Sequence, residues 1–173
     1  SSRAFDACTD ARADYYPPAL RQEIDAINAL VYDNINNGVY RTGFAATQEA
    51  YEEAFHALFD ALAAIEERLS RQRYLAGARL TEADWRLFTT LIRFDAVYYG
   101  HFKCNLRRIV DYPNLSNYVR ELYQVPVIAA TVDFDQIKRH YYGSHRGLNP
   151  TGIVPLGPEL DFTAIHDRGR FGN

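Results

Sequence analysis

The chain of 173 residues contains no Met, one Trp and only two Cys. Cys8 and Cys104 stand far apart in the sequence and do not make a disulfide framework. No apolar stretch approaches the ~18 residues that span a bilayer, and no secretory signal begins the chain. A net charge of -3 without any basic run argues against nucleic acid as a partner. We expect a reduced, cytoplasmic protein with neither nucleic acid nor membrane as a partner.

Position 1 also lacks Met, and we therefore expect the sequence to be a piece of a longer protein. The composition is otherwise that of a globular domain, with 47% hydrophobic and 24% charged residues. A chain of this length buries roughly 70% of its unfolded surface in one core. Thirteen Tyr and ten Phe are present. Because a buried Tyr needs a partner for its hydroxyl, this content leaves room for an aromatic-lined pocket.

The strongest local signal for secondary structure lies at residues 80–96. Thr81 has the position of a helix N-cap, and Asp84 completes a capping box by reaching back to the N–H of Thr81. Phe88 and Ile92 follow at helical spacing, so one stripe of this helix is apolar. The segment predicts a buried central helix. Capping accounts for Asp84, and we assign this residue to structure instead of acid–base chemistry.

Apolar stripes at helical spacing predict four further helices, at residues 15–38, 47–72, 113–126 and 134–142. Gly38 is predicted to end the first of them. Gly43 is predicted to supply unusual backbone angles in a turn at residues 39–46. The acidic pairs Glu52–Glu53 and Glu66–Glu67 are interpreted as solvated helix faces.

The last thirty residues are rich in Gly and Pro and show no period. We predict an irregular tail at residues 143–173 that packs on the bundle through Ile153, Val154, Leu156 and Phe162. Residues 1–14 are predicted to be a linker, and residues 15–142 the helical bundle. No alternating strand pattern and no internal repeat occurs, so the predicted fold class is all-α.

Six short segments carry a resemblance to a known family. They read NGVYRTGFA at 37–45, RFDAVY at 93–98, HFKCN at 101–105, DYPNL at 111–115, VDFDQI at 132–137 and NPTGI at 149–153. Together with the capping box, they resemble the glutathionyl-hydroquinone reductases, which form the xi class of the glutathione transferases. The resemblance runs from about Phe5 to Gly172 and implies that class's C-terminal helical bundle.

The resemblance implies an activity for the longer protein. It implies that S-glutathionyl-hydroquinones are reduced to hydroquinones, with glutathione as the co-substrate. In the family the nucleophile is the cysteine of a Cys-Pro-x-Ala segment in an N-terminal thioredoxin-like domain. This chain has no Cys-Pro pair, so neither Cys8 nor Cys104 inherits that role and the chain alone is expected to be inactive. The partners implied are glutathione, glutathionyl-hydroquinones, the protein's own N-terminal domain and a second copy in a homodimer.

Tyr40 and Tyr141 are the candidate substrate-binding residues. By spacing alone each is better explained as a half-buried aromatic whose hydroxyl bonds to the backbone. In the family, a tyrosine of a V-Y-[KR]-x-G-F-A segment and another of an H-Y-[FY] segment line the quinol pocket and hydrogen-bond the hydroquinone. Both segments match this sequence, at Tyr40 and Tyr141, and the resemblance therefore implies that role for them.

A metal site is the first alternative. His101, Cys104, His140 and His145 are residue types that bind zinc. Their spacing differs from the usual i, i+4 clamp, and no second Cys pair supports them. We therefore expect no metal.

Cys104 as a nucleophile is the second alternative. Lys103 and the neighbouring arginines would lower the thiol pKa if they converged on it, although a lone Cys in a charged link is more typical of a surface thiol.

Two other functions of the protein stay open as well. One is a different glutathione transferase activity, conjugation or dehalogenation, because a fold does not determine a reaction. The other is a non-enzymatic assembly module.

Overall fold

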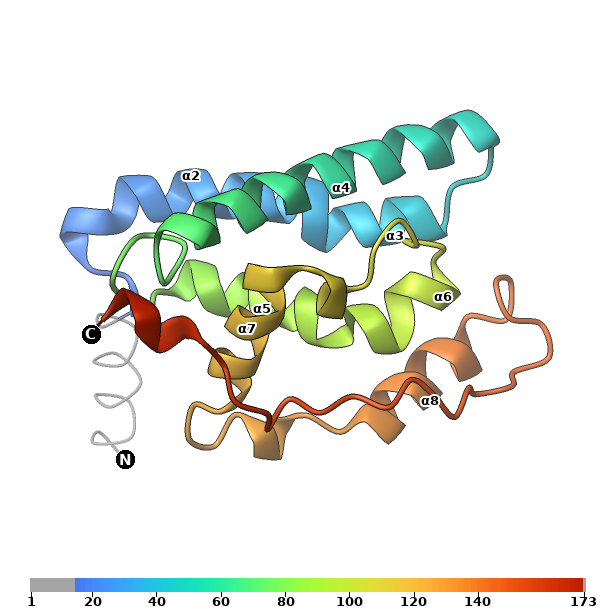
Figure 1. The fold of residues 1–173 in the computed structure, drawn as a ribbon. Helices are drawn as coiled ribbons and strands as arrows, with labels where there is room; N and C mark the ends of the chain where they lie inside the picture. The colour runs from blue at the N-terminus through green and yellow to red at the C-terminus, as the bar shows by residue number, and fades with distance from the viewer. Residues whose placement is uncertain (1–14, 173) are drawn as a thin grey trace, which may run out of the picture.

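The computed structural model describes residues 15–172, which form a bundle of helices with an irregular C-terminal tail (Figure 1). The α-helices are α2 (Arg21–Val31), α3 (Asn37–Gly43), α4 (Gln48–Arg71), α5 (Glu82–Arg93), α6 (Tyr99–His101), α7 (Pro113–Tyr123) and α8 (Phe134–Ser144). Two π-helical turns, η2 (Tyr32–Asn36) and η3 (Phe94–Tyr98), join α2 to α3 and α5 to α6. Short 3-10 turns are η1 (Pro18–Leu20), η4 (Ile109–Asp111), η5 (Ala129–Thr131) and η6 (Arg168–Phe171). No strand occurs in this range, which confirms the all-α prediction.

The helices form layers around α5. Figure 1 shows α4 lying along the continuous α2–η2–α3 rod, with α5 and α6 below them and α8 and the tail at the bottom. The apolar stripe of α5 is buried, and Leu87 and Leu91 are almost fully excluded from solvent. None of the helices within residues 15–172 has the length and hydrophobicity that a membrane span requires.

The predicted capping box at the start of α5 is present. Asp84 Oδ2 accepts the Thr81 N–H at 2.9 Å, and Oδ1 accepts the Leu75 N–H at 3.0 Å and the Tyr118 hydroxyl at 2.6 Å. Burial raises the pKa of the Asp84 carboxyl to about 6, against the lowering effect of these hydrogen bonds. Asp84 therefore ties α5 to α7 and to the preceding connector, as its structural assignment predicted.

Two predictions about glycines were wrong. The first helix does not end at Gly38, because the rod continues through η2 and α3 to Gly43. Gly38 packs against Leu58 of α4, and a Cβ would lie 3.7 Å from that side chain. Gly43 is helical and does not supply turn angles. A glycine is required there because the ring of Phe102 occupies the place of its Cβ.

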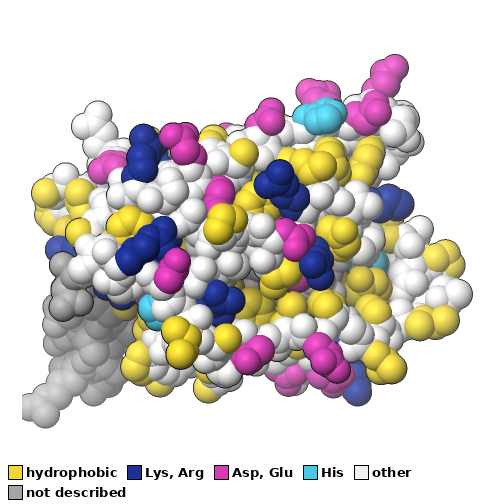
Figure 2. Space-filling view, in the orientation of Figure 1, with side chains coloured by type: hydrophobic (Ala, Val, Ile, Leu, Met, Phe, Trp, Pro, Cys, Tyr) yellow, Lys and Arg dark blue, Asp and Glu magenta, His cyan; other side chains and the backbone are white. Residues whose placement is uncertain are grey.

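The solvated-face interpretation holds for Glu52 and Glu53, which are exposed on α4. Figure 2 shows acidic side chains gathered at the edge of the molecule where α4 begins. Glu66 is different: its carboxylate accepts the N–H groups of Asn114 and Leu115, each at 2.8 Å. These donors belong to the first turn of α7, whose N–H groups have no partner within the helix. Glu66 thus anchors one helix to another.

The tail is irregular, as predicted. The side chains through which it packs on the bundle differ in part from those predicted. Phe162 is buried, whereas Ile153 is 69% exposed and Leu156 is 99% exposed. The strongest attachment of the tail is Arg168, whose side chain is fully buried and donates hydrogen bonds to backbone carbonyls at the end of α4. The predicted linker at residues 1–14, including Cys8, lies outside the described residues.

Candidate functional site

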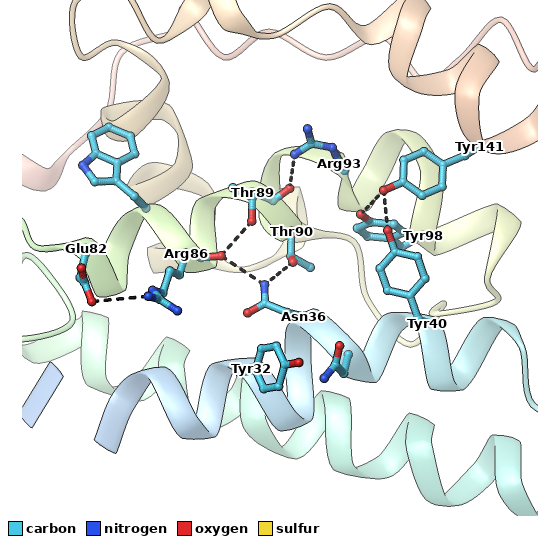
Figure 3. Close-up of a pocket in the computed structure, with 12 residues that line it drawn as sticks. Tyr32, Asn36, Tyr40, Glu82, Arg86, Thr89, Thr90, Arg93, Tyr98 and Tyr141 are labelled. Atoms are coloured by element: carbon cyan, nitrogen blue, oxygen red, sulfur yellow. Dashed lines mark hydrogen bonds and ion pairs between the residues drawn. The ribbon is translucent and has the colours of Figure 1, made fainter. Parts of the chain in front are cut away.

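Three tyrosine hydroxyls meet at one point of the bundle. Tyr40 of α3 and Tyr141 of α8 lie 101 residues apart in the sequence, and their hydroxyl oxygens are 2.7 Å apart. The hydroxyl of Tyr98, the last residue of η3, lies 2.9 Å from that of Tyr141. Figure 3 shows the three phenols pointing toward one another from three different elements. The structure therefore brings together the two tyrosines singled out in the sequence and adds a third.

Local helix geometry explains how these hydroxyls meet. Both π-helical turns lie beside the site, and such turns widen the helix by one residue and re-aim the side chains that follow. η3 ends at Tyr98, and η2 ends directly before the α3 turn that carries Tyr40. Tyr141 lies in the last turn of α8. Phe102 supports all three rings, with its centroid 5.3 Å from Tyr40 and 5.4 Å from Tyr98.

A cavity of about 630 Å³ opens from this tyrosine cluster (Tyr40, Tyr98 and Tyr141) along the groove between α2–α3 and α5. Its volume is within the usual range for small-molecule sites. The α2–α3 wall includes Tyr32 and Asn36, and the α5 wall includes Trp85, the single tryptophan of the chain. The polar lining is held in place internally. Asn36 Nδ2 donates to the Thr90 hydroxyl at 2.6 Å and to the Arg86 carbonyl at 3.2 Å.

The cluster is an array of hydrogen-bond donors. Burial, followed by the hydrogen bond to Tyr141, raises the pKa of Tyr40 to about 12. Burial and the same partner also raise the pKa of Tyr98 well above its ordinary value. Tyr40 and Tyr98 are therefore protonated at neutral pH. The hydroxyls are joined to one another through Tyr141, and an O–H of the cluster can donate to a ligand by exchanging one of these internal hydrogen bonds.

Cys104 does not have the environment of a nucleophile. Its side chain is fully buried, which corrects the expectation of a surface thiol. Its sulfur lies 3.9 Å from the carbonyl oxygen of Val39 and 3.8 Å from that of Phe102. Burial raises the pKa of the thiol to about 12. Because the thiolate is the reactive form, this cysteine is unreactive at neutral pH.

The histidines considered as zinc ligands form a different arrangement. His101 Nε2 lies 3.1 Å from His145 Nδ1, and the two rings stack at 5.3 Å with an interplanar angle of 11°. The pair joins α6 to the end of α8, one turn beyond Tyr98 and Tyr141. No group of three or more His, Cys, Asp or Glu side chains in residues 15–172 is placed to hold a metal ion.

Sequence reasoning missed Tyr98 and Asn36. Tyr98 belongs to the RFDAVY segment that carried the family resemblance, yet nothing in its spacing distinguishes it from the buried aromatics around it. Asn36 follows an apolar residue on a helix and resembles an ordinary surface amide. Both reach the site because of π-helical turns, which leave no signature in a single sequence.

Comparisons with known proteins find similar sequences and similar folds. A family model described as the glutathione S-transferase C-terminal domain matches residues 48–121. Glutathionyl-hydroquinone reductase PcpF of Sphingobium chlorophenolicum is 61% identical over 155 residues, which cover 90% of this chain and 50% of the relative. Glutathionyl-hydroquinone reductase YqjG of Escherichia coli (strain K12) is 54% identical over 170 residues, which cover 98% of this chain and 52% of the relative. The chain therefore spans about half the length of the curated relatives it matches.

Solved structures show the same fold. The glutathione-bound structure of YqjG, a glutathione transferase homolog from Escherichia coli K-12, matches with a TM-score of 0.88 and 55% identity, over 90% of this chain and 50% of that one. A xi-class transferase from Natrialba magadii matches with a TM-score of 0.89 and 52% identity, over 91% of this chain and 48% of that one. Sequence identity, family model and fold agree: the described bundle has the fold of a glutathione S-transferase C-terminal domain, and the chain is similar to xi-class transferases over about nine tenths of its length.

Proposed function

We propose that this chain is the helical domain of a glutathionyl-hydroquinone reductase and forms the quinol side of its active site. In this proposal the longer protein works in the cytoplasm and reduces S-glutathionyl-hydroquinones to hydroquinones with glutathione. Tyr40 and Tyr141 bind the hydroquinone oxygens. The observation that carries the proposal is the convergence of these two hydroxyls, 2.7 Å apart, at the end of a cavity large enough for a substituted ring.

The reaction needs a thiolate that residues 15–172 do not supply, because the sulfur of Cys104 is buried and its pKa is raised. We place the nucleophile in a preceding thioredoxin-like domain. Its thiolate attacks the glutathionyl sulfur, and the bond between sulfur and ring carbon breaks with its electron pair remaining on the ring. Protonation of that carbon gives the hydroquinone and leaves a protein–glutathione mixed disulfide. A second glutathione thiolate then releases oxidised glutathione and restores the cysteine.

The tyrosine cluster contributes to the step in which the ring leaves. Negative charge builds on the ring carbon and spreads to the ring oxygens, and O–H donors aimed at those oxygens stabilise it, as in an oxyanion hole. Tyr40 stays protonated because its pKa is about 12. An O–H of the cluster becomes available to the substrate when the bond between Tyr40 and Tyr141 is exchanged for a bond to a ring oxygen.

Fluorescence of Trp85 tests the proposal, because this single tryptophan lines the cavity. We expect hydroquinone to quench the emission of the chain in a saturable manner. Tyr40→Phe and Tyr141→Phe are each expected to weaken binding about two- to tenfold, the usual effect of one lost hydrogen bond. Tyr123→Phe is the control, since Tyr123 packs against Phe162 and does not line the cavity. Equal affinities for all four proteins would refute the role of the two tyrosines.

Two further parts of the proposal concern the longer protein. We expect Tyr141→Phe to lower its turnover of a glutathionyl-hydroquinone about tenfold or more, because a donor to the leaving ring is lost.

We also propose that the longer protein forms a homodimer, to which this domain contributes contact surface. Sedimentation of the longer protein checks the second point, and a monomer at high concentration would contradict it.

A further inference from the structure

A second cavity lies against α5, next to the one that opens from the tyrosine cluster. Its volume is about 300 Å³, and its lining is mainly apolar: Phe88, Ile92, Ile128, Val132 and Ile137. These residues come from α5, from the connector after α7 and from the first turn of α8. The cavity lies at the lower end of the volumes that small-molecule sites have.

The two cavities share a wall. Trp85, Thr89 and Arg93 line both of them, and they follow one another at intervals of four residues, so they stand in one row along α5. Figure 3 shows Arg93 projecting from α5 between Thr89 and Tyr141. The apolar cavity therefore adjoins the cavity of the tyrosine cluster along this row of side chains.

Arg93 stands at the boundary of the two cavities. Its Nη1 donates to the Thr89 carbonyl at 2.6 Å, so the guanidinium is held along its own helix. It forms no ion pair with a carboxylate among residues 15–172. Its charge acts on the phenol of Tyr40, against the raising effect of burial on that pKa. The apolar stem of an arginine can line a hydrophobic space while its head group stays polar.

We propose that the second cavity is an apolar subsite that takes an alkyl or aryl substituent of a hydroquinone whose oxygens lie at the tyrosine cluster. This inference rests on the proposed function and deepens it by naming the preferred substrate class, hydroquinones with an apolar ring substituent. The lining contains no carboxylate, and Arg93 is its one charged side chain. A charged substituent that entered this cavity would lose its hydration without gaining a partner of opposite sign, unless it were an anion beside Arg93.

The expected gain in affinity follows from buried area. Each methylene group removed from water strengthens binding about fourfold. A phenyl substituent is therefore expected to bind at least ~10-fold more tightly than hydrogen, after allowance for imperfect packing.

The test is an NMR titration of the chain, labelled with 13C at the isoleucine δ1 methyls and at the tyrosine ring carbons. The two ligands are hydroquinone and phenylhydroquinone. Both are expected to shift the signals of Tyr40 and Tyr141. Phenylhydroquinone alone is expected to shift the methyls of Ile128 and Ile137, which line the second cavity and not the first.

A variant that fills the cavity supplies the second half of the test. Val132→Phe is expected to remove the preference for phenylhydroquinone and to leave the affinity for hydroquinone within about twofold. Val110→Phe is the matched control: Val110 is 44% exposed, lines neither cavity and should leave the preference intact. Should Val132→Phe fail to fold, Ile137→Ala takes its place, with an expected loss of about fourfold per methylene removed, for phenylhydroquinone alone.

The outcomes separate the two proposals. If hydroquinone leaves the signals of Tyr40 and Tyr141 unchanged, the proposed function is refuted. If both ligands shift the tyrosines but phenylhydroquinone leaves Ile128 and Ile137 unmoved, only the subsite is refuted. A preference for phenylhydroquinone that survives in Val132→Phe also overturns the subsite.

Discussion

Gly43 of α3 lies directly against the ring of Phe102: a Cβ on the glycine would stand 2.3 Å from Cγ and Cδ1 of that ring. Phe102 is fully buried and packs against all three rings of the tyrosine cluster. The space that this glycine leaves empty is therefore what lets the phenylalanine support the candidate site.

Gly43→Ala is expected to destabilise the chain by about 1–3 kcal/mol, the usual cost of forcing an extra carbon into a packed core. The displaced Phe102 ring is also expected to weaken quinol binding. Urea denaturation and Trp85 fluorescence measure the two effects. Gly143→Ala is the control, because a Cβ there meets nothing within 4 Å. A variant of Gly43 as stable as that control would show that the ring moves aside without cost.

The pair formed by His101 and His145 makes stability depend on pH. Burial, followed by the charges of His145 and Lys103, lowers the pKa of His101 from 6.5 to about 4. The unfolded chain therefore binds a proton that the folded chain excludes, and the pair's contribution to stability is lost as pH falls from about 6.5 toward 4. Asp84 acts in the opposite direction, because its folded pKa is raised to about 6.

Imidazole NMR separates these opposing contributions by following His101 directly. Its ring is expected to stay neutral down to about pH 4 in the folded chain. In His145→Gln, where one charge that opposes protonation is removed, its pKa should move upward. Titration of His101 near pH 6.5 in both proteins would contradict the burial argument.

Tyr118→Phe is expected to cost about 2 kcal/mol at pH 8, because the hydroxyl donates to the buried Asp84 carboxylate and hydrogen bonds to charged groups are among the stronger ones. Loss of this donor also removes a lowering effect on the pKa of Asp84, which should rise above its value of about 6. The cost should therefore shrink at pH 5, where the carboxyl is mostly neutral. A cost that is independent of pH would mean that the bond contributes equally to both protonation states.

Arg168→Ala is expected to release the tail and destabilise the chain by about 2–4 kcal/mol. The guanidinium donates to the carbonyls of Leu69, Gln72 and Arg73 at 2.8–2.9 Å, and these buried or partly buried acceptors would lose their partner. Arg168→Lys should recover little of the loss, because an ammonium cannot reproduce the planar fork. Arg170→Ala, which removes a partly exposed ion pair with Asp167, should cost less than ~1 kcal/mol. Thermal denaturation ranks the three variants.

Much of the fold could be predicted from the sequence, because the helices carry local signals. Thr47 accepts the Ala50 N–H at 3.1 Å and Asp133 accepts the Gln136 N–H at 3.1 Å, each at a predicted helix start. Caps and apolar periodicity depend on residues three or four apart, and such signals are readable without knowledge of the rest of the chain. The family resemblance pointed to Tyr40 and Tyr141, whose binding role stays a prediction.

Tertiary structure alone decided how these parts meet. The place of Tyr98 in the cluster, the need for a glycine at 43 and the attachment of the tail by Arg168 all depend on contacts between residues far apart in the chain. Each π-helical turn holds one residue more than an α-helical turn and so changes the direction in which the following side chains point. Packing between helices favours these turns over the locally preferred α-helix. The sequence by itself determined most of the helical segments and where they begin, although it did not predict the helix at residues 37–43. The convergence of three phenols required the whole bundle, because three separate elements supply them.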